Sequence, residues 1–77
     1  MNNIIILGAG ESGLGSALLA KRNKYDVFVS DSSEISDQVK NKLVESGIDF
    51  EENSHQKAKT LKPDFIVKSP GISDANY

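Results

Sequence analysis

Residues 8–13 have the residue types and spacing that most directly suggest a chemical role. They read Gly-Ala-Gly-Glu-Ser-Gly, after an apolar run at residues 4–7 and before a helix-like segment at residues 14–20. In a parallel α/β unit the first such glycine makes a tight turn, the second lets the main chain approach a diphosphate, and the third lets the helix pack against the strand. The N–H groups of residues 10–13 would then face an anion, which the helix dipole also attracts. The stretch predicts a phosphate site and favours a mononucleotide or dinucleotide ligand over a purely structural turn.

Two more stretches are expected to lie beside the glycine turn. Asp31 closes the apolar segment at residues 26–30, near the offset of about 20 residues that the nucleotide-binding fingerprint requires. The loop Ser-Pro-Gly at residues 69–71 follows another apolar segment, at residues 65–68. Because the carboxyl ends of parallel strands meet at one edge of the sheet, we expect these stretches and the glycine turn to converge on one pocket at a topological switch point.

The elements that must position these residues alternate between strands and helices. Periodicity predicts strands at residues 4–7, 26–30, 48–51 and 65–68, and helices at residues 12–22, 33–45 and 54–61. This order predicts an α/β fold, a Rossmann-like parallel sheet of about four strands in the order 3-2-1-4 with helices on both faces. We expect Asp31, Ser32 or Ser33 to cap the second helix, Gly47 to end it, and Ser54 to cap the third.

Length and composition restrict the class of protein. The 77 residues allow one small domain, shorter than a complete two-half nucleotide-binding sheet, so we expect a piece of a longer protein. The net charge of -2 and the lack of a basic run argue against nucleic acid, and the absence of cysteine excludes disulfides and thiol chemistry. With no signal peptide and no apolar run of about 18 residues, we expect a soluble cytoplasmic protein without a membrane partner.

The remaining reactive side chains do not form a catalytic or metal-binding pattern. His55 is the only histidine and has no partner at metal-binding spacing, so we expect a polar surface residue. Ser12, Ser16 and Ser69 lack a histidine base or an acyl-transfer motif. We therefore predict no catalytic residue and no metal ligand in this chain.

The sequence resembles the N-terminal domain of the Mur ligases of bacterial cell-wall synthesis, most closely that of the D-glutamate-adding ligases. The resemblance rests on residues 8–13 with their preceding strand, on Val-Ser-Asp at residues 29–31, and above all on Val-Lys-Ser-Pro-Gly-Ile at residues 67–72. Nicotinamide enzymes share the first two features, whereas the last is typical of these ligases. The resemblance spans nearly the whole chain but only the first of the family's three domains.

The resemblance implies that residues 1–77 bind the UDP end of UDP-N-acetylmuramoyl-L-alanine and bind no NAD. The amides around Glu11 and Ser12, with the Ser12 hydroxyl, would hold the diphosphate, while Asp31 and Ser32 would meet the uracil. The residues expected to bind UDP are Gly8, Gly10, Glu11, Ser12, Gly13, Asp31, Ser32, Ser69, Pro70 and Gly71. Because the charge of Glu11 would repel a diphosphate, we expect this side chain to face outward on the first helical turn.

The parent reaction implied by the resemblance is ATP-dependent amide-bond formation with Mg²⁺, carried out together with the central and C-terminal domains. This chain contains neither the Gly-Lys-Thr/Ser loop that holds ATP nor an acidic cluster for Mg²⁺, so we expect a substrate-binding domain that is inactive alone and needs no cofactor itself. Two alternatives remain at this point. One is the NAD-binding half of a dehydrogenase, in which Asp31 accepts from the ribose hydroxyls. The other is a nucleotide-sensing regulatory module.

Overall fold

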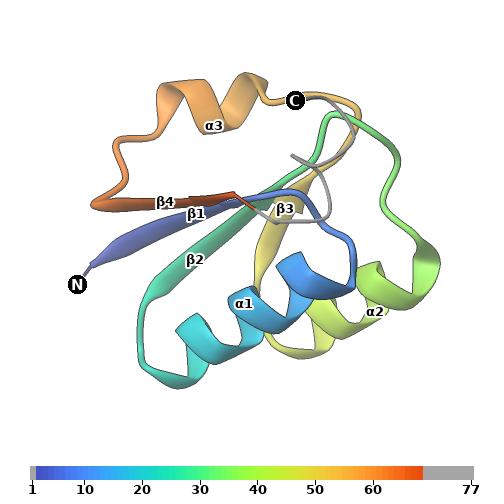
Figure 1. Ribbon diagram of the computed structural model, residues 1–77, viewed down its shortest axis with the longest axis horizontal. Helices are drawn as coiled ribbons and strands as arrows, with labels where there is room; N and C mark the ends of the chain where they lie inside the picture. Colours follow the sequence, from blue (N-terminus) through green and yellow to red (C-terminus); the bar gives the residue numbers. More distant parts are fainter. Residues whose placement is uncertain (1, 69–77) are drawn as a thin grey trace.

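A four-stranded parallel sheet organises the computed structural model, which describes residues 2–68 (Figure 1). The strand order β3-β2-β1-β4 confirms the predicted order and the Rossmann-like α/β class. The elements follow one another as β1 (Asn3–Leu7), α1 (Glu11–Arg22), β2 (Asp26–Ser30), α2 (Asp37–Glu45), β3 (Asp49–Glu51), α3 (Gln56–Thr60) and β4 (Phe65–Lys68). None of these helices is long and apolar enough to cross a membrane.

The face of the sheet that α1 and α2 cover contains the main hydrophobic core (Figure 1). Side chains alternate across a strand, so Ile6 of β1 and its neighbour Val29 of β2 point to this face together. Both are fully buried, as are Ala17 of α1 and Leu43 of α2. Burying a side chain such as Leu43 contributes about 1.5–3 kcal/mol relative to leaving it in water.

The opposite face is covered more thinly, with α3 as its only helix among residues 2–68 (Figure 1). Ile5 and Phe28 are buried there, but α3 has only five residues and none of them is buried. The side chains of Phe65 and Ile66 on β4 remain 50% and 61% exposed. The two faces of the sheet therefore differ in how much apolar packing holds their helices.

The second helix starts later than the periodicity predicts. It begins at Asp37, and its cap is Ser36, whose hydroxyl accepts from the N–H of Val39 at 3.3 Å. The prediction that Asp31, Ser32 or Ser33 caps it is wrong, because the Asp31 carboxylate is bound elsewhere and an irregular connection follows β2. Gly47, at φ 71°, confirms the predicted left-handed stop.

The third helix is also shorter than predicted, running over Gln56–Thr60. The Ser54 hydroxyl accepts from the N–H of Gln56 at 2.9 Å, as a cap would. The next two N–H groups, of Lys57 and Ala58, donate instead to the carboxylate of Glu51 at 3.0 and 2.8 Å. A side chain from β3 thus does much of the capping that sequence analysis assigned to Ser54 alone.

Candidate functional site

The glycine turn between β1 and α1 has the conformation that its first glycine predicts. Gly8 adopts φ 103°, a left-handed conformation that side chains disfavour. Its N–H donates to the carbonyl oxygen of Ser30 at 2.7 Å, so the turn is fixed to the end of β2. The tight-turn role of the first glycine is confirmed.

The third glycine is required by packing within the protein. A Cβ placed on Gly13 would lie 1.9 Å from the carbonyl oxygen of Gly8, closer than any real side chain tolerates. The start of α1 can approach β1 only because this position has no side chain. The close-packing role of Gly13 is confirmed.

The second glycine has a different environment. A Cβ on Gly10 would meet none of the surrounding atoms of residues 2–68 within 4 Å, and its φ of -78° is open to any residue. Packing among the described residues therefore does not require glycine at this position. The described residues leave the space in front of Gly10 open, as the approach of a ligand to the main chain requires.

The N-terminus of α1 has no side-chain cap, because its cap residue is Gly10. Glu11 and Ser12 follow in the first turn and are both exposed. Glu11 also borders a shallow groove between α1 and α2, together with Gln38 and Lys42. An acidic residue at this position stabilises the helix through its dipole.

The carboxylate of Asp31, the residue after β2, accepts two main-chain hydrogen bonds. Its Oδ2 accepts from the N–H of Ala9 in the glycine turn at 2.8 Å, and its Oδ1 accepts from the N–H of Ser33 at 2.8 Å. The carboxylate is therefore an anchor of the turn, which sequence analysis missed because it considered only ligand roles and a helix cap. Each oxygen keeps a further lone pair that can accept another donor. Ser32 lies next to it and is exposed.

The end of β4 lies beside the glycine turn. Lys68, its last residue, pairs in register with Leu7, which immediately precedes Gly8. The structure thus brings the ends of β1, β2 and β4 to one edge, and with them the glycine turn and Asp31. The predicted site residues Ser69, Pro70 and Gly71 lie outside the described residues.

A polar cluster that sequence analysis did not identify lies next to this edge. Ser30 is fully buried, and its hydroxyl contacts Oε2 of Glu51 at 2.9 Å, the carbonyl oxygen of Ser54 at 3.2 Å and Nδ1 of His55. His55 is half-buried, so the expectation of a plain surface residue overlooked its contact. A serine in an apolar strand was the available signal, because a buried hydroxyl needs partners.

Several opposing effects act on the carboxyl group of Glu51. Burial by itself raises the pKa of Glu51. The backbone N–H groups of Lys57 and Ala58, the Ser30 hydroxyl and the charge of His55 all lower it, and the net pKa is below the ordinary value. Glu51 is therefore held in its charged form. The described residues contain no group of acidic, histidine or cysteine side chains that could hold a metal ion.

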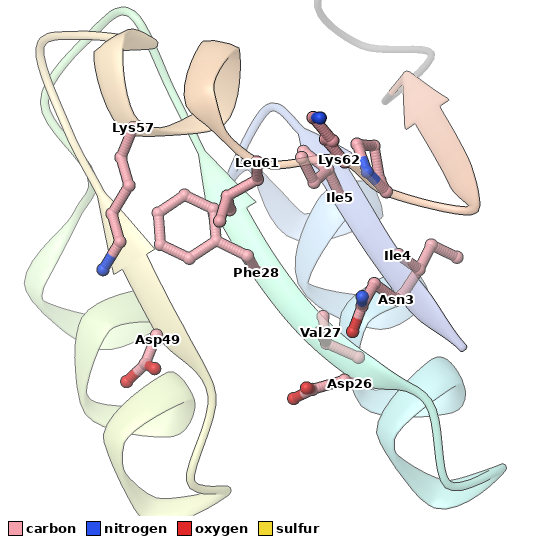
Figure 2. Close-up of a pocket in the computed structure, with 11 residues that line it drawn as sticks. Asn3, Ile4, Ile5, Asp26, Val27, Phe28, Asp49, Lys57, Leu61 and Lys62 are labelled. Atoms are coloured by element: carbon pink, nitrogen blue, oxygen red, sulfur yellow. The ribbon is translucent and has the colours of Figure 1, made fainter. Parts of the chain in front are cut away.

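A cavity of about 330 Å³ lies away from this edge, between α3 and the sheet (Figure 2). Phe28 and Leu61 line its apolar part, and Asn3, Asp26 and Asp49, the first residues of β1, β2 and β3, lie on its rim. It therefore opens toward the amino ends of the strands. We place the candidate site at the carboxyl edge instead, because the glycine turn and the N-terminus of α1 are there.

A parallel sheet with a glycine turn and an acidic strand end at its switch point defines a Rossmann-like α/β unit. More specifically, the chain belongs to the family described as MurD N-terminal domain, whose sequence model matches residues 3–76. This match confirms the resemblance to the Mur ligases and gives no support to the dehydrogenase or sensor alternatives.

The chain is similar to proteins named UDP-N-acetylmuramoylalanine–D-glutamate ligase in several bacteria. It is 49% identical over 71 residues to that of Christiangramia forsetii and 52% identical over 71 residues to that of Cytophaga hutchinsonii, each match covering 92% of this chain and 16% of the relative. The identity to the protein of Bacteroides fragilis is 51% over 72 residues, covering 94% of this chain and 16% of the relative. The chain thus spans about a sixth of the length of these relatives. No solved structure matches it.

Proposed function

We propose that this chain binds the UDP end of UDP-N-acetylmuramoyl-L-alanine as the first domain of a D-glutamate-adding ligase. The observation that carries the proposal is an open glycine turn at a helix N-terminus, at the edge where β1, β2 and β4 end, in a chain of the MurD N-terminal domain family. The relatives that carry this ligase name match the chain over more than nine tenths of its length.

The diphosphate would lie against the main chain of the glycine turn. The N–H groups of residues 10–13 are donors at the positive end of the α1 dipole, and the exposed Ser12 hydroxyl adds another. Because a Cβ of Gly10 would meet no surrounding atom of the described residues within 4 Å, there is room among them for phosphate oxygens. Glu11 would stay in solvent beside α2, away from the anion.

The uracil would lie near Asp31 and Ser32. After its bonds to Ala9 and Ser33, the Asp31 carboxylate still has acceptor sites for the N–H of the uracil ring. The same carboxylate would then hold both the turn and the base, so the diphosphate and uracil subsites would be mechanically linked. Residues 69–71 would close the pocket from the β4 side.

The chemistry of the whole ligase would take place in its other domains. There, with ATP and Mg²⁺ as proposed cofactors, the substrate carboxylate would attack the γ-phosphate of ATP to give an acyl phosphate and ADP. The amine of D-glutamate would then attack the acyl carbon, forming the amide and releasing phosphate. This chain would hold the UDP end of the substrate during both steps without supplying a catalytic residue or binding a cofactor, and we propose that the ligase acts in the cytoplasm.

An amide-shift titration of this chain with UDP, and separately with NAD, tests the proposal. We expect UDP to shift the amides of residues 8–13 and 31–33 at modest affinity, because contacts from other domains are missing. NAD is expected to shift them less at equal concentration. Larger shifts with NAD at the same residues would contradict the proposal and favour a dinucleotide site.

A further inference from the structure

The polar cluster around Ser30 is well placed to control the geometry of the glycine turn. Ser30 is the only buried polar residue among residues 2–68, and its hydroxyl contacts Glu51, Ser54 and His55, all from the segment that runs from β3 into α3. No buried side-chain polar atom in this part of the chain lacks a partner. The end of β2 is therefore joined to the β3–α3 connection by a fully satisfied cluster.

The number of protons in this cluster determines the direction of its hydrogen bonds. The Ser30 hydroxyl has one proton, and the Glu51 carboxylate, which is charged, is its strongest acceptor. The contact between Ser30 and His55 then requires the proton to be on Nδ1 of His55. His55 is the donor, Ser30 relays the bond, and Glu51 is the final acceptor.

A continuous series of contacts leads from this cluster to the glycine turn. The N–H of Asp31 donates to the carbonyl oxygen of Glu51 at 3.1 Å, and the carbonyl oxygen of Asp31 accepts from the N–H of Ser54 at 3.1 Å. Both main-chain groups of Asp31 are thus bonded to the β3–α3 segment, while its side chain holds Ala9. Any shift of that segment against β2 would move the carboxylate that holds the turn.

We propose that Ser30, Glu51 and His55 are positioning residues for the nucleotide site. They fix the β3–α3 segment against the end of β2 and thereby hold Asp31 and the glycine turn in the geometry that binds the ligand. The role in binding rests on the proposed function, whereas the effect on the turn is a property of the ligand-free protein. They reach the turn by two connections: the Ser30 carbonyl oxygen accepts from the N–H of Gly8 at 2.7 Å, and the Asp31 carboxylate holds Ala9.

Two amide variants of His55 test the proposal. Asparagine places a side-chain N–H near the position of Nδ1, whereas glutamine places its amide near the position of Nε2. We expect His55→Gln to speed hydrogen exchange at the Ala9 amide and to weaken UDP binding, each by about fivefold. His55→Asn should restore both to within about twofold of the parent. Nitrogen shifts of the parent imidazole should show the proton on Nδ1.

A core variant separates positioning from general loss of stability. The control is Ile48→Val, because Ile48 is buried just before β3 and lies away from the site. This variant should speed exchange throughout the core without a selective change at Ala9. If His55→Gln leaves Ala9 exchange like that of the parent, or changes it no more than the rest of the core, the proposal is overturned. If the parent fails to bind UDP while Ala9 responds as expected, the proposed ligand is wrong and the positioning of the turn stands.

Discussion

Two regions hold the candidate site from opposite sides, and they do so by different physical means. On the α1 side the glycine turn is fixed by steric fit, with Gly13 against the carbonyl of Gly8 and a core of fully buried side chains beneath it. On the α3 side the end of β2 is fixed by polar contacts of the Ser30 hydroxyl with Glu51, Ser54 and His55, and the helix buries none of its residues. Steric contacts fail abruptly when atoms are added, whereas hydrogen bonds depend on protonation and can be weakened gradually.

The largest expected effect comes from adding one carbon on the α1 side. Gly13→Ala places a Cβ 1.9 Å from a backbone oxygen, so α1 must move away from β1. We expect the free energy of unfolding to fall by more than about 3 kcal/mol, at or beyond the upper range for overpacking. Urea denaturation followed by circular dichroism measures it. Gly15→Ala is the matched control, because a Cβ at that exposed helical position meets no atom within 4 Å; an equal loss in both variants would contradict the steric explanation.

The same turn offers a change that should affect binding and leave the fold intact. A Cβ on Gly10 meets no neighbouring atom of the described residues within 4 Å, but a larger side chain would occupy the space proposed for phosphate. We expect Gly10→Val to abolish UDP binding in calorimetry while changing the free energy of unfolding by about 1 kcal/mol or less, as for other changes at a helix cap. A folded variant that still binds UDP like the parent would show that the turn does not hold phosphate.

Asp31 joins the two regions, so its removal should have two separable consequences. Asp31→Ala leaves the N–H groups of Ala9 and Ser33 without their acceptor, which should cost about 1–3 kcal/mol of stability and weaken UDP and ADP alike. Loss of the proposed uracil contact should weaken UDP by about another tenfold. Calorimetry with UDP and with ADP, at a temperature where the parent and the variant are both folded, separates the loss of the anchor from the loss of the uracil contact. Equal losses of affinity for UDP and ADP would show that Asp31 does not contact the uracil and serves only to anchor the glycine turn.

The α1 side could be predicted from sequence because its signals are local. The roles of Gly8 and Gly13 follow from a six-residue spacing, and the strands follow from apolar runs. The anchor role of Asp31 could not be predicted in the same way, because its partner Ala9 is 22 residues away. The Ser30 cluster joins residues 21 to 25 positions apart, and no local pattern shows which buried hydroxyl meets which loop.

Long-range contacts also explain why α2 begins later in the chain than the sequence predicts. Sequence analysis offered three residues near position 31 as caps, and each has a side chain capable of capping. Asp31 is instead bound to the glycine turn, while the N–H of Ile35 donates to the carboxylate of Glu52 and Ile35 itself is buried. These long-range contacts keep the chain extended as far as Ser36, the cap that is observed.

The smallest expected effect concerns the hydrogen-bonded side and its dependence on pH. Burial raises the pKa of Glu51, but the hydrogen bonds from Lys57, Ala58 and Ser30 together lower it by a larger amount. The folded-state pKa therefore lies below the unfolded value of about 4.3. A lowered folded pKa means that this stabilisation is fully present above the unfolded pKa and disappears as the pH falls through the folded pKa. We expect Glu51→Gln to be less stable than the parent at pH 7 and the difference to shrink steadily below about pH 4.3.

The control is Glu45→Gln, at an exposed position in the last turn of α2, which should differ little from the parent in stability at pH 7 or at pH 3. Urea denaturation from pH 7 to pH 3 measures both, and a Glu51→Gln difference that persists unchanged at pH 3 would mean that the charge of this carboxylate does not hold α3 to the sheet.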